Sequence, residues 1–222
     1  MRKLGCYGEN PGQFNCPRGV TYLNDDEILV ADDNNHRIQQ FNVQTGNFVK
    51  SFGKKGTGEG EFRNPENVCM DGDGNVVVAD YANNRIQVLT KDGKPVFKFG
   101  DSGGEKLNKP TGCIHHKNMF IISDCRNNSL NAFDSSGKFL YKIGKAGEAD
   151  GQLSCPWGLC VEKYGNRQNL LVCDRDNDRI QQFTVDGYFT GKTVSGLQDP
   201  IYIATTPDGR ILVSDYKTKR MS

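Results

Sequence analysis

The stretch ILVADDNNHRIQQF at residues 28–41 decides the fold, because the chain contains further copies of it. It returns as VVVADYANNRIQVL at 76–89, FIISDCRNNSLNAF at 120–133 and LLVCDRDNDRIQQF at 170–183, and it begins again as ILVSDYKTKR at 211–220. Self-similarity at a fixed step identifies a repeat protein, in which each copy is one supersecondary unit. The 222 residues are therefore expected to form one array.

A proline before a short apolar segment sets the period of the repeat. Pro17, Pro65, Pro110, Pro156 and Pro200 follow one another at steps of 48, 45, 46 and 44 residues. This period is typical of four-stranded propeller blades. The apolar segments are short, rich in Val, Ile and Phe, and separated by Asp-Gly and Ser-Gly turns, which favours strands over helices. We therefore expect an all-β propeller whose second strands, such as residues 76–78, are covered on both faces.

Three positions of the repeated stretch predict a local turn. An Asp closes the second strand and is expected to accept hydrogen bonds from the backbone amides of the following turn. Three residues later an Asn, such as Asn35, suits a left-handed turn conformation. An Arg then starts the third strand and is expected to brace neighbouring loops. These signature residues are Asp32, Asp80, Asp124, Asp174 and Asp215, with Arg37, Arg85 and Arg179.

Composition describes an ordinary globular chain. The formal charge is +1, charged residues make up 25% and hydrophobic residues 36%, so the strongly basic balance of many nucleic-acid binders is absent from the total. No long apolar run and no apolar signal core are present, which predicts a cytoplasmic protein without a membrane partner.

The eight cysteines include no Cys-x-x-Cys pair. Several of them occupy matching repeat positions: Cys16 and Cys155 precede the proline, and Cys69 and Cys160 follow it. Such cysteines are expected to be small buried apolar residues rather than disulfide or zinc ligands.

Gly-x-Phe, Pro-x-Gly-Val and Val-Ala-Asp-x-x-Asn-x-Arg-Ile-Gln, recurring at one step, resemble the NHL repeat and in particular the propeller of TRIM-NHL proteins. The resemblance implies one NHL-type β-propeller over residues 1–222, with repeats at roughly 8–53, 56–100, 103–144, 147–192 and, in part, 197–222. About five blades of the family's six are then present, an incomplete ring. Members of that family act as ubiquitin ligases or post-transcriptional repressors, but the RING pattern that ligation needs is not in this sequence, so no enzyme activity is expected of it.

The resemblance also implies that ligands bind the propeller face formed by the loop before the first strand and the loop after the second. The positions that vary between repeats on this face are the candidate ligand contacts, with cations for phosphates and aromatic rings for unpaired bases. They are Arg18, His36, Tyr81, Arg126, Trp157, Arg175, Tyr216 and Lys217. Asp33 and Glu66 share the face and oppose this charge, so the expected partner is either RNA, as a stem-loop or a single strand, or a protein substrate.

Two other interpretations stay open. One is a purely protein–protein scaffold. The other is a metal-dependent hydrolase or lyase, because related propellers hold a metal on their first strands. Those strands offer almost no ligands here, and His115 and His116 are expected to be turn or surface residues. Neither a metal nor a small-molecule cofactor is therefore expected.

Overall fold

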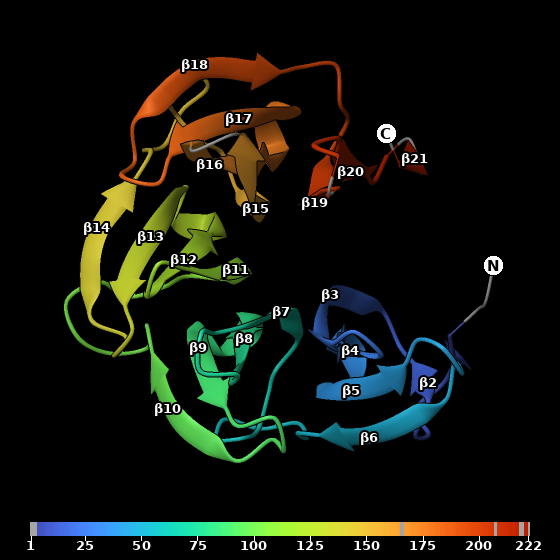
Figure 1. Ribbon diagram of the computed structural model, residues 1–222. Coiled ribbons are helices and arrows are strands. Elements are labelled where there is room, and N and C mark those ends of the chain that lie inside the picture. Colours follow the sequence, from blue (N-terminus) through green and yellow to red (C-terminus); the bar gives the residue numbers. More distant parts are fainter. Residues whose placement is uncertain (1–3, 165–166, 207, 218–219, 222) are drawn as a thin grey trace. The chain divides into compact units, whose positions relative to one another are not determined.

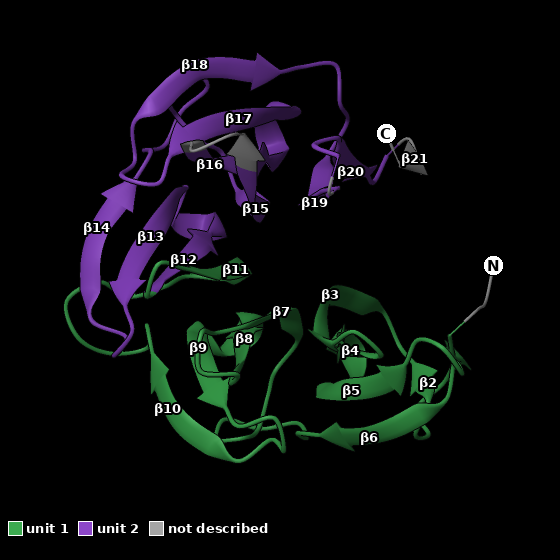
Figure 2. Cartoon of the chain, viewed as in Figure 1, with its two compact units in different colours: residues 1–118 green, residues 119–222 purple. Residues whose placement is uncertain are grey.

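The computed structural model describes residues 4–164, 167–206, 208–217 and 220–221. The chain divides into two compact units, residues 1–118 and 119–222 (Figure 2). Both are built mainly from short antiparallel sheets, and the helical elements among the described residues are single 3₁₀ turns. No described helix has the length and apolar character needed to cross a membrane.

Unit 1 contains two complete four-stranded blades (Figure 1). Their strands follow one another in sequence order, and each pairs antiparallel with the next. Blade 1 consists of β3 (Pro17–Asn24), β4 (Glu27–Asp32), β5 (Arg37–Asn42) and β6 (Phe48–Phe52). Blade 2 consists of β7 (Pro65–Met70), β8 (Val76–Asp80), β9 (Arg85–Leu89) and β10 (Pro95–Phe99).

Three further strands complete unit 1. The short strands β1 (Cys6–Tyr7) and β2 (Gln13–Phe14) pair in parallel. Strand β11 (Pro110–His116) lies beside β7.

One apolar core cluster of unit 1 lies between its two blades. Leu29 and Ala31 of β4 pack in one cluster with Val68 of β7 and with Val76 and Val78 of β8. Residues 76–79 are completely buried, which confirms the expected two-sided burial of this second strand. Burying each such valine or leucine contributes roughly 1.5–3 kcal/mol, so the apolar runs hold the blades together.

Unit 2 repeats the same order of strands. Strands β12 (Met119–Asp124), β13 (Ser129–Asp134) and β14 (Phe139–Ile143) pair in sequence. Blade 4 follows as β15 (Pro156–Tyr164), β16 (Arg167–Asp174), β17 (Arg179–Thr184) and β18 (Phe189–Val194). Blade 5 consists of β19 (Pro200–Thr205), β20 (Ile211–Asp215) and β21 (Arg220–Met221).

The glycine two residues after the repeat proline permits close approach of successive first strands. A Cβ atom on Gly19 would lie 2.7 Å from the Cα of Asn67 in β7, and one on Gly158 would lie 2.4 Å from the carbonyl oxygen of Ile201 in β19. Real Cβ atoms do not come this close to backbone, so glycine is required there.

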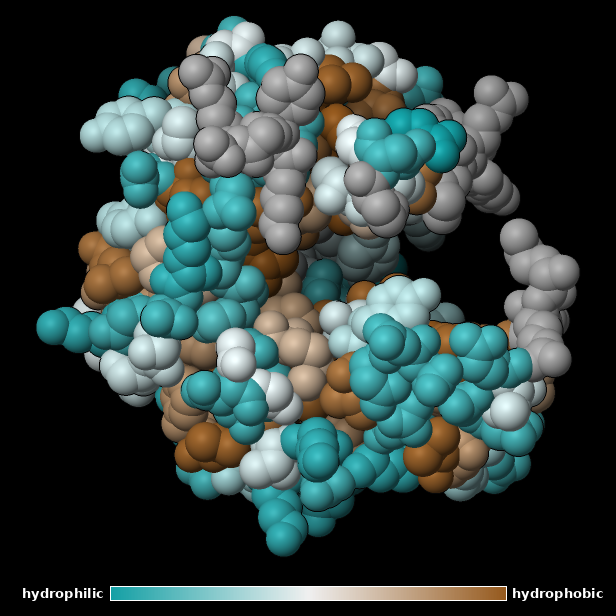
Figure 3. Space-filling model, in the orientation of Figure 1, coloured by the Kyte–Doolittle hydropathy of each residue, from teal (hydrophilic) through white to brown (hydrophobic). Residues whose placement is uncertain are grey.

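Hydrophilic side chains cover much of the visible surface of each unit, with apolar patches between them (Figure 3).

Candidate recognition face

The signature aspartates hold together the end of each blade that carries the 3₁₀ turns. Asp32 is completely buried. Its Oδ2 accepts hydrogen bonds from Asn35 Nδ2 at 2.8 Å, Arg37 Nε at 2.9 Å and Gln39 Nε2 at 3.0 Å. Its Oδ1 accepts from the Asn15 amide at 2.7 Å. Asp80 and Asp174 accept the same four hydrogen bonds, from the equivalent Asn, Arg and Gln side chains and from the equivalent loop amide of their own blades.

The expected backbone partner of these aspartates was wrong. The amide belongs to the loop that precedes the repeat proline, and the 3₁₀ turn after the Asp receives no capping bond from its side chain. We call this loop the pre-proline loop; it comprises residues 8–16, 56–64 and 147–155 in blades 1, 2 and 4. Arg37 Nη2 also donates to the Asn10 and Gln13 carbonyls of that loop, at 2.9 and 2.8 Å. The signature arginines therefore brace loops, and the carboxylate fixes the loop to the blade.

The left-handed residue lies one position later than the expected Asn. The 3₁₀ turns η1 (Asp33–Asn35), η2 (Tyr81–Asn83), η3 (Cys125–Asn127) and η4 (Arg175–Asn177) contain the signature Asn as their last residue. The residue after each turn has φ between 53° and 55°. The side-chain amide of the signature Asn instead donates hydrogen bonds to the signature Asp and to the pre-proline loop. Asn35 Nδ2, for example, donates to Asp32 Oδ2 and to the Gly8 carbonyl. The left-handed residues are His36, Asn84, Asn128 and Asp178.

These left-handed residues connect each blade to the next. His36 Nδ1 accepts a hydrogen bond from the Asn64 amide at 3.1 Å, and Asn84 Oδ1 accepts from the Lys109 amide at 2.9 Å. In unit 2, Asn128 Oδ1 accepts from the Cys155 amide at 2.8 Å. Asp178 Oδ1 accepts from the Asp199 amide at 2.7 Å. In every case the donor stands immediately before the next repeat proline.

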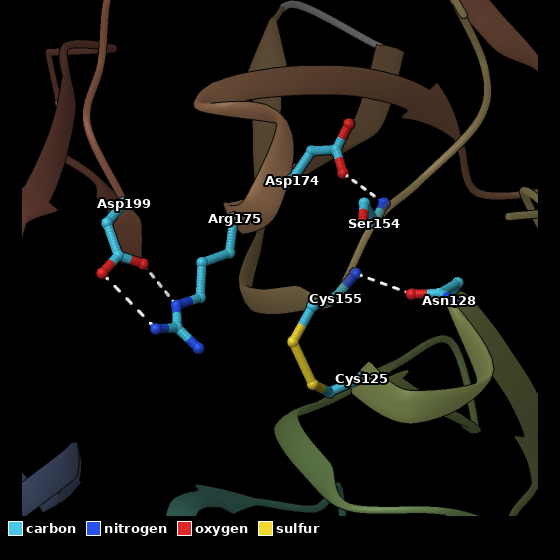
Figure 4. The surroundings of a disulfide bond; sticks show 7 residues. All are labelled: Cys125, Asn128, Ser154, Cys155, Asp174, Arg175 and Asp199. Atoms are coloured by element: carbon cyan, nitrogen blue, oxygen red, sulfur yellow. Dashed lines mark hydrogen bonds and ion pairs between the residues drawn. A yellow bond between two sulfur atoms is a disulfide. The ribbon is translucent and has the colours of Figure 1, made fainter. Parts of the chain in front are cut away.

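A second contact, made by side chains, accompanies each of these bonds. The first residue of the 3₁₀ turn pairs with the residue before the next proline, and we call this pair a clasp. In the first clasp the Asp33 carboxylate lies near the Asn64 side chain. Tyr81 lies beneath the Lys109 ammonium, 4.7 Å from its ring centroid. Cys125 and Cys155 form a disulfide, and Arg175 forms an ion pair with Asp199 (Figure 4).

The prediction that the cysteines at matching repeat positions form no disulfide was therefore wrong for Cys155, which pairs with Cys125. Both occupy recurrent positions of the repeat, but the two positions belong to successive units and meet only in the folded chain. Cys125 takes the place of Asp33 and Tyr81, and Cys155 that of Asn64 and Lys109. All four clasps can be found in the sequence by comparing the residue after each signature Asp with the residue before the next repeat proline.

Arg18, a candidate phosphate contact, lies in a charged cluster of unit 1. Its Nε is 3.8 Å from Asp33 Oδ2 and 3.7 Å from Glu66 Oε2, and both carboxylates are buried. Burial raises the pKa of Asp33, although Asn64 and Arg18 lie nearby. The guanidinium thus already faces two acidic groups of the protein.

Trp157 and Arg175 interact directly in unit 2. The Arg175 guanidinium lies 4.6 Å from the centre of the Trp157 ring while it also contacts Asp199. Trp157 itself is only 8% exposed. An indole covered by a cation is not an open stacking platform, because its face is in use.

The remaining candidates differ in accessibility. Arg126 on η3 and Tyr216 and Lys217 after β20 are exposed. His36 is half-buried, and desolvation lowers its pKa, which favours the neutral ring that accepts the Asn64 bond. In each unit, the face that carries the 3₁₀ turns, which we call the signature face, therefore has a clasped layer and an exposed layer. Asn34 and Arg63 also belong to the exposed layer of unit 1, and Asp176 belongs to that of unit 2.

The described residues contain no group of three His, Cys, Asp or Glu side chains that could hold a metal ion. His115 and His116 are the last two residues of β11 and lie half-buried beside the turn at 117–118.

The blades and their signature turns define an all-β protein of the propeller class. The NHL repeat profile matches residues 14–41 and 62–89, and the chain is an NHL-repeat β-propeller with partial homology to TRIM-NHL proteins.

That homology covers short stretches. The chain is 56% identical over 41 residues to Protein wech of Drosophila melanogaster, a match that covers 18% of this chain and 5% of wech. It is 46% identical over 46 residues to lin-41 of Caenorhabditis elegans, covering 21% and 4%. It is 45% identical over 42 residues to the mouse E3 ubiquitin-protein ligase TRIM32, covering 19% and 6%. The chain thus matches only a small part of each relative's length.

Solved structures share the fold over most of the chain. A chain of the nidogen/laminin complex superimposes with a TM-score of 0.75 at 17% identity, covering 92% of this chain and 74% of that one. Virginiamycin B lyase of Staphylococcus aureus superimposes with a TM-score of 0.69 at 15% identity, covering 96% and 67%. At such identities the likeness extends to the fold alone.

Proposed function

We propose that this NHL-repeat propeller is a recognition module that binds a protein partner through the exposed layer of the signature face. The observation that carries this proposal is the pairing of two candidate phosphate-binding cations. Arg18 faces Asp33 and Glu66, and Arg175 faces Asp199. Mixed charge with partly covered aromatic groups suits a protein surface better than a continuous phosphate backbone, which selects for uncompensated cations.

The relatives support the proposal that such a propeller serves as one part of a larger protein. TRIM32 is an E3 ubiquitin-protein ligase, and its matched part is a repeat segment. In our proposal the propeller selects the partner, and any ubiquitin transfer or post-transcriptional repression belongs to other segments of a larger assembly.

RNA is the second candidate, and a specific observation favours it. Arg126, Tyr216 and Lys217 are exposed in unit 2 and combine two cations with one aromatic ring. That combination of residue types binds phosphates and unpaired bases.

Parallel selections test the proposal. The purified chain is offered a displayed peptide library and a random RNA pool under the same salt conditions. We expect enriched peptides whose binding weakens in Arg126→Glu and Tyr216→Ala variants. Lys138→Glu is the matched charge reversal, because Lys138 is exposed in the same unit at the β13–β14 turn. Enrichment of RNA alone would replace the protein partner with the second candidate, and enrichment of neither would contradict both.

A further inference from the structure

Two cysteines of unit 1 meet where the first strand of blade 2 packs beside β11. Cys69 lies on β7 and is paired in register with Val77 of β8. The Sγ atom of Cys113, on β11, lies 3.7 Å from the carbonyl oxygen of the same Val77. The two side chains therefore converge on one point of blade 2, although they come from separate repeats.

The alternation of side chains along β7 directs Cys69 toward β11. The preceding residue, Val68, packs in the apolar cluster with Leu29 and Ala31 of blade 1, so the Cys69 side chain points to the opposite face of the sheet. The Cys113 thiol lies beside that of Cys69 and, together with burial, raises the pKa of Cys69 well above its usual value. Both cysteines are free thiols. Two reduced sulfur atoms therefore lie side by side between two strands.

The sequence places facing thiols at this junction of repeats alone. Cys113 is the third residue after its repeat proline, and the other repeats carry aliphatic residues there, namely Val20, Val68, Leu159 and Ile203. Cys69 is the fourth residue after its proline, a position that the other repeats fill with Thr21, Ile114, Cys160 and Ala204. Packing of successive first strands thus does not require sulfur at either position.

The surroundings of the two thiols decide which metal ion they suit. His115 follows Cys113 by two residues on β11, but its ring packs over Gly72, where an added Cβ would lie 3.2 Å from His115 Cε1. The described part of the chain contains no group of three metal ligands. Zinc takes three or four protein ligands, so two thiols do not suit it. Soft thiolate ligands select Cu(I), which forms stable complexes with two sulfur atoms.

We propose that Cys69 and Cys113 form a two-coordinate site for Cu(I). As the two Cu–S bonds form, both S–H bonds break and two protons pass to the solvent, while the copper stays Cu(I). The complex carries one negative charge. Cys69 is half-buried and Cys113 is buried, so the ion enters from the side of Cys69, which also keeps that charge within reach of water.

The bound ion would link β7 to β11 and so connect the first strands of two successive repeats. The two cysteines do not belong to the exposed layer of the signature face. The copper site therefore does not rest on the proposed recognition function, and either proposal can fail without the other.

Competition with a coloured chelator tests the proposal on the full chain. Cu(I) is supplied under argon as its acetonitrile complex in the presence of ferrozine, without thiol reductants, so that the bridge between Cys125 and Cys155 stays intact. We expect each chain to withhold one Cu(I) from ferrozine, and X-ray absorption to show two sulfur neighbours around the copper. Failure to withhold copper, or nitrogen neighbours around it, would overturn the proposal.

Variants taken from the other repeats locate the site with little disturbance of the fold. Cys69→Thr introduces the residue type of Thr21, and Cys113→Val introduces that of Val68. Both variants should lose the withheld copper, whereas Cys160→Thr, the same change at the same position of blade 4, should keep it. Cu(I) should also raise the unfolding midpoint of the unmodified chain and of Cys160→Thr, but not that of the other two variants. Copper retained by Cys69→Thr or Cys113→Val, or lost by Cys160→Thr, would contradict the assignment.

Discussion

Cys125 and Cys155 are joined by a disulfide at the same place in the repeat where Arg175 and Asp199 form an ion pair. Both pairs connect the turn after one signature aspartate to the residue before the next repeat proline. The clasp thus recurs at the same two repeat positions, but a different type of interaction forms it in each pair of repeats. The contribution of each interaction to stability can be measured separately.

Loss of the covalent clasp should lower stability. The bridge closes a loop with a sequence separation of 30, which corresponds to about 3.5 kcal/mol of loop-closure entropy in the unfolded chain. Cys125→Ser and Cys155→Ser should each lower the free energy of unfolding by about that amount in urea titrations. Cys6→Ser is the control, because Cys6 is exposed and forms no disulfide. Equal stability of all three variants would show that the bridge does not form in solution.

Asp80→Ala should be among the most destabilising single changes in unit 1. The Asp80 carboxylate is completely buried and Arg85 is 3% exposed, so the substitution leaves a buried guanidinium without its carboxylate. Breaking a buried pair in this way costs about 3–5 kcal/mol. Asp73→Ala, in the exposed β7–β8 turn, should cost less than about 0.5 kcal/mol in the same urea titration. A cost for Asp80→Ala no greater than that of the control would refute the role of the signature network.

His36 should make stability depend on pH. Desolvation lowers its pKa from 6.5, so the unfolded chain binds the proton more readily than the folded chain does. Stability is then fully present above pH 6.5 and falls as the pH drops through the lowered value. His36→Asn should remove this dependence and keep the bond to the Asn64 amide, because Asn84 and Asn128 already fill that role in other repeats. Thermal melts between pH 5 and 8 compare the two proteins, and parallel curves would contradict the assignment.

Trp157 reports on the clasped layer of unit 2. It is the chain's single tryptophan and is covered by Arg175. Arg175→Ala should raise the acrylamide quenching constant of its fluorescence, since the covering side chain is lost. Arg210→Ala should leave that constant unchanged, because Arg210 is exposed and pairs with Asp208. A constant that does not respond to Arg175→Ala would mean that the guanidinium does not cover the ring.

The repeat made the fold predictable, while its finer details were not. The recurring Asp, Arg and apolar strands repeat because every blade needs the same turn, so four strands per repeat could be inferred from one sequence. The amide partner of Asp32 could not, because the pre-proline loop returns to that carboxylate only after folding. The disulfide was also missed, because Cys125 and Cys155 occupy different positions of successive repeats and come together only in the folded chain.

The same reason separates the candidate contacts into two groups. Asp33, Tyr81, Cys125 and Arg175 occupy one repeat position whose residue type varies, as it would also vary on a binding surface. Each of these residues has a complementary partner in the next repeat, and the partner varies with it. Arg126 and Tyr216, by contrast, are exposed, and they remain predicted contacts.

The central claim is that the exposed layer of the signature face carries recognition. Its most direct test is the affinity of the best selected peptide for Arg126→Glu compared with Lys138→Glu, measured by calorimetry on folded proteins. We expect at least a tenfold loss for Arg126→Glu, equivalent to about 1.4 kcal/mol, and no loss for Lys138→Glu. Equal affinities of the two variants would contradict the claim.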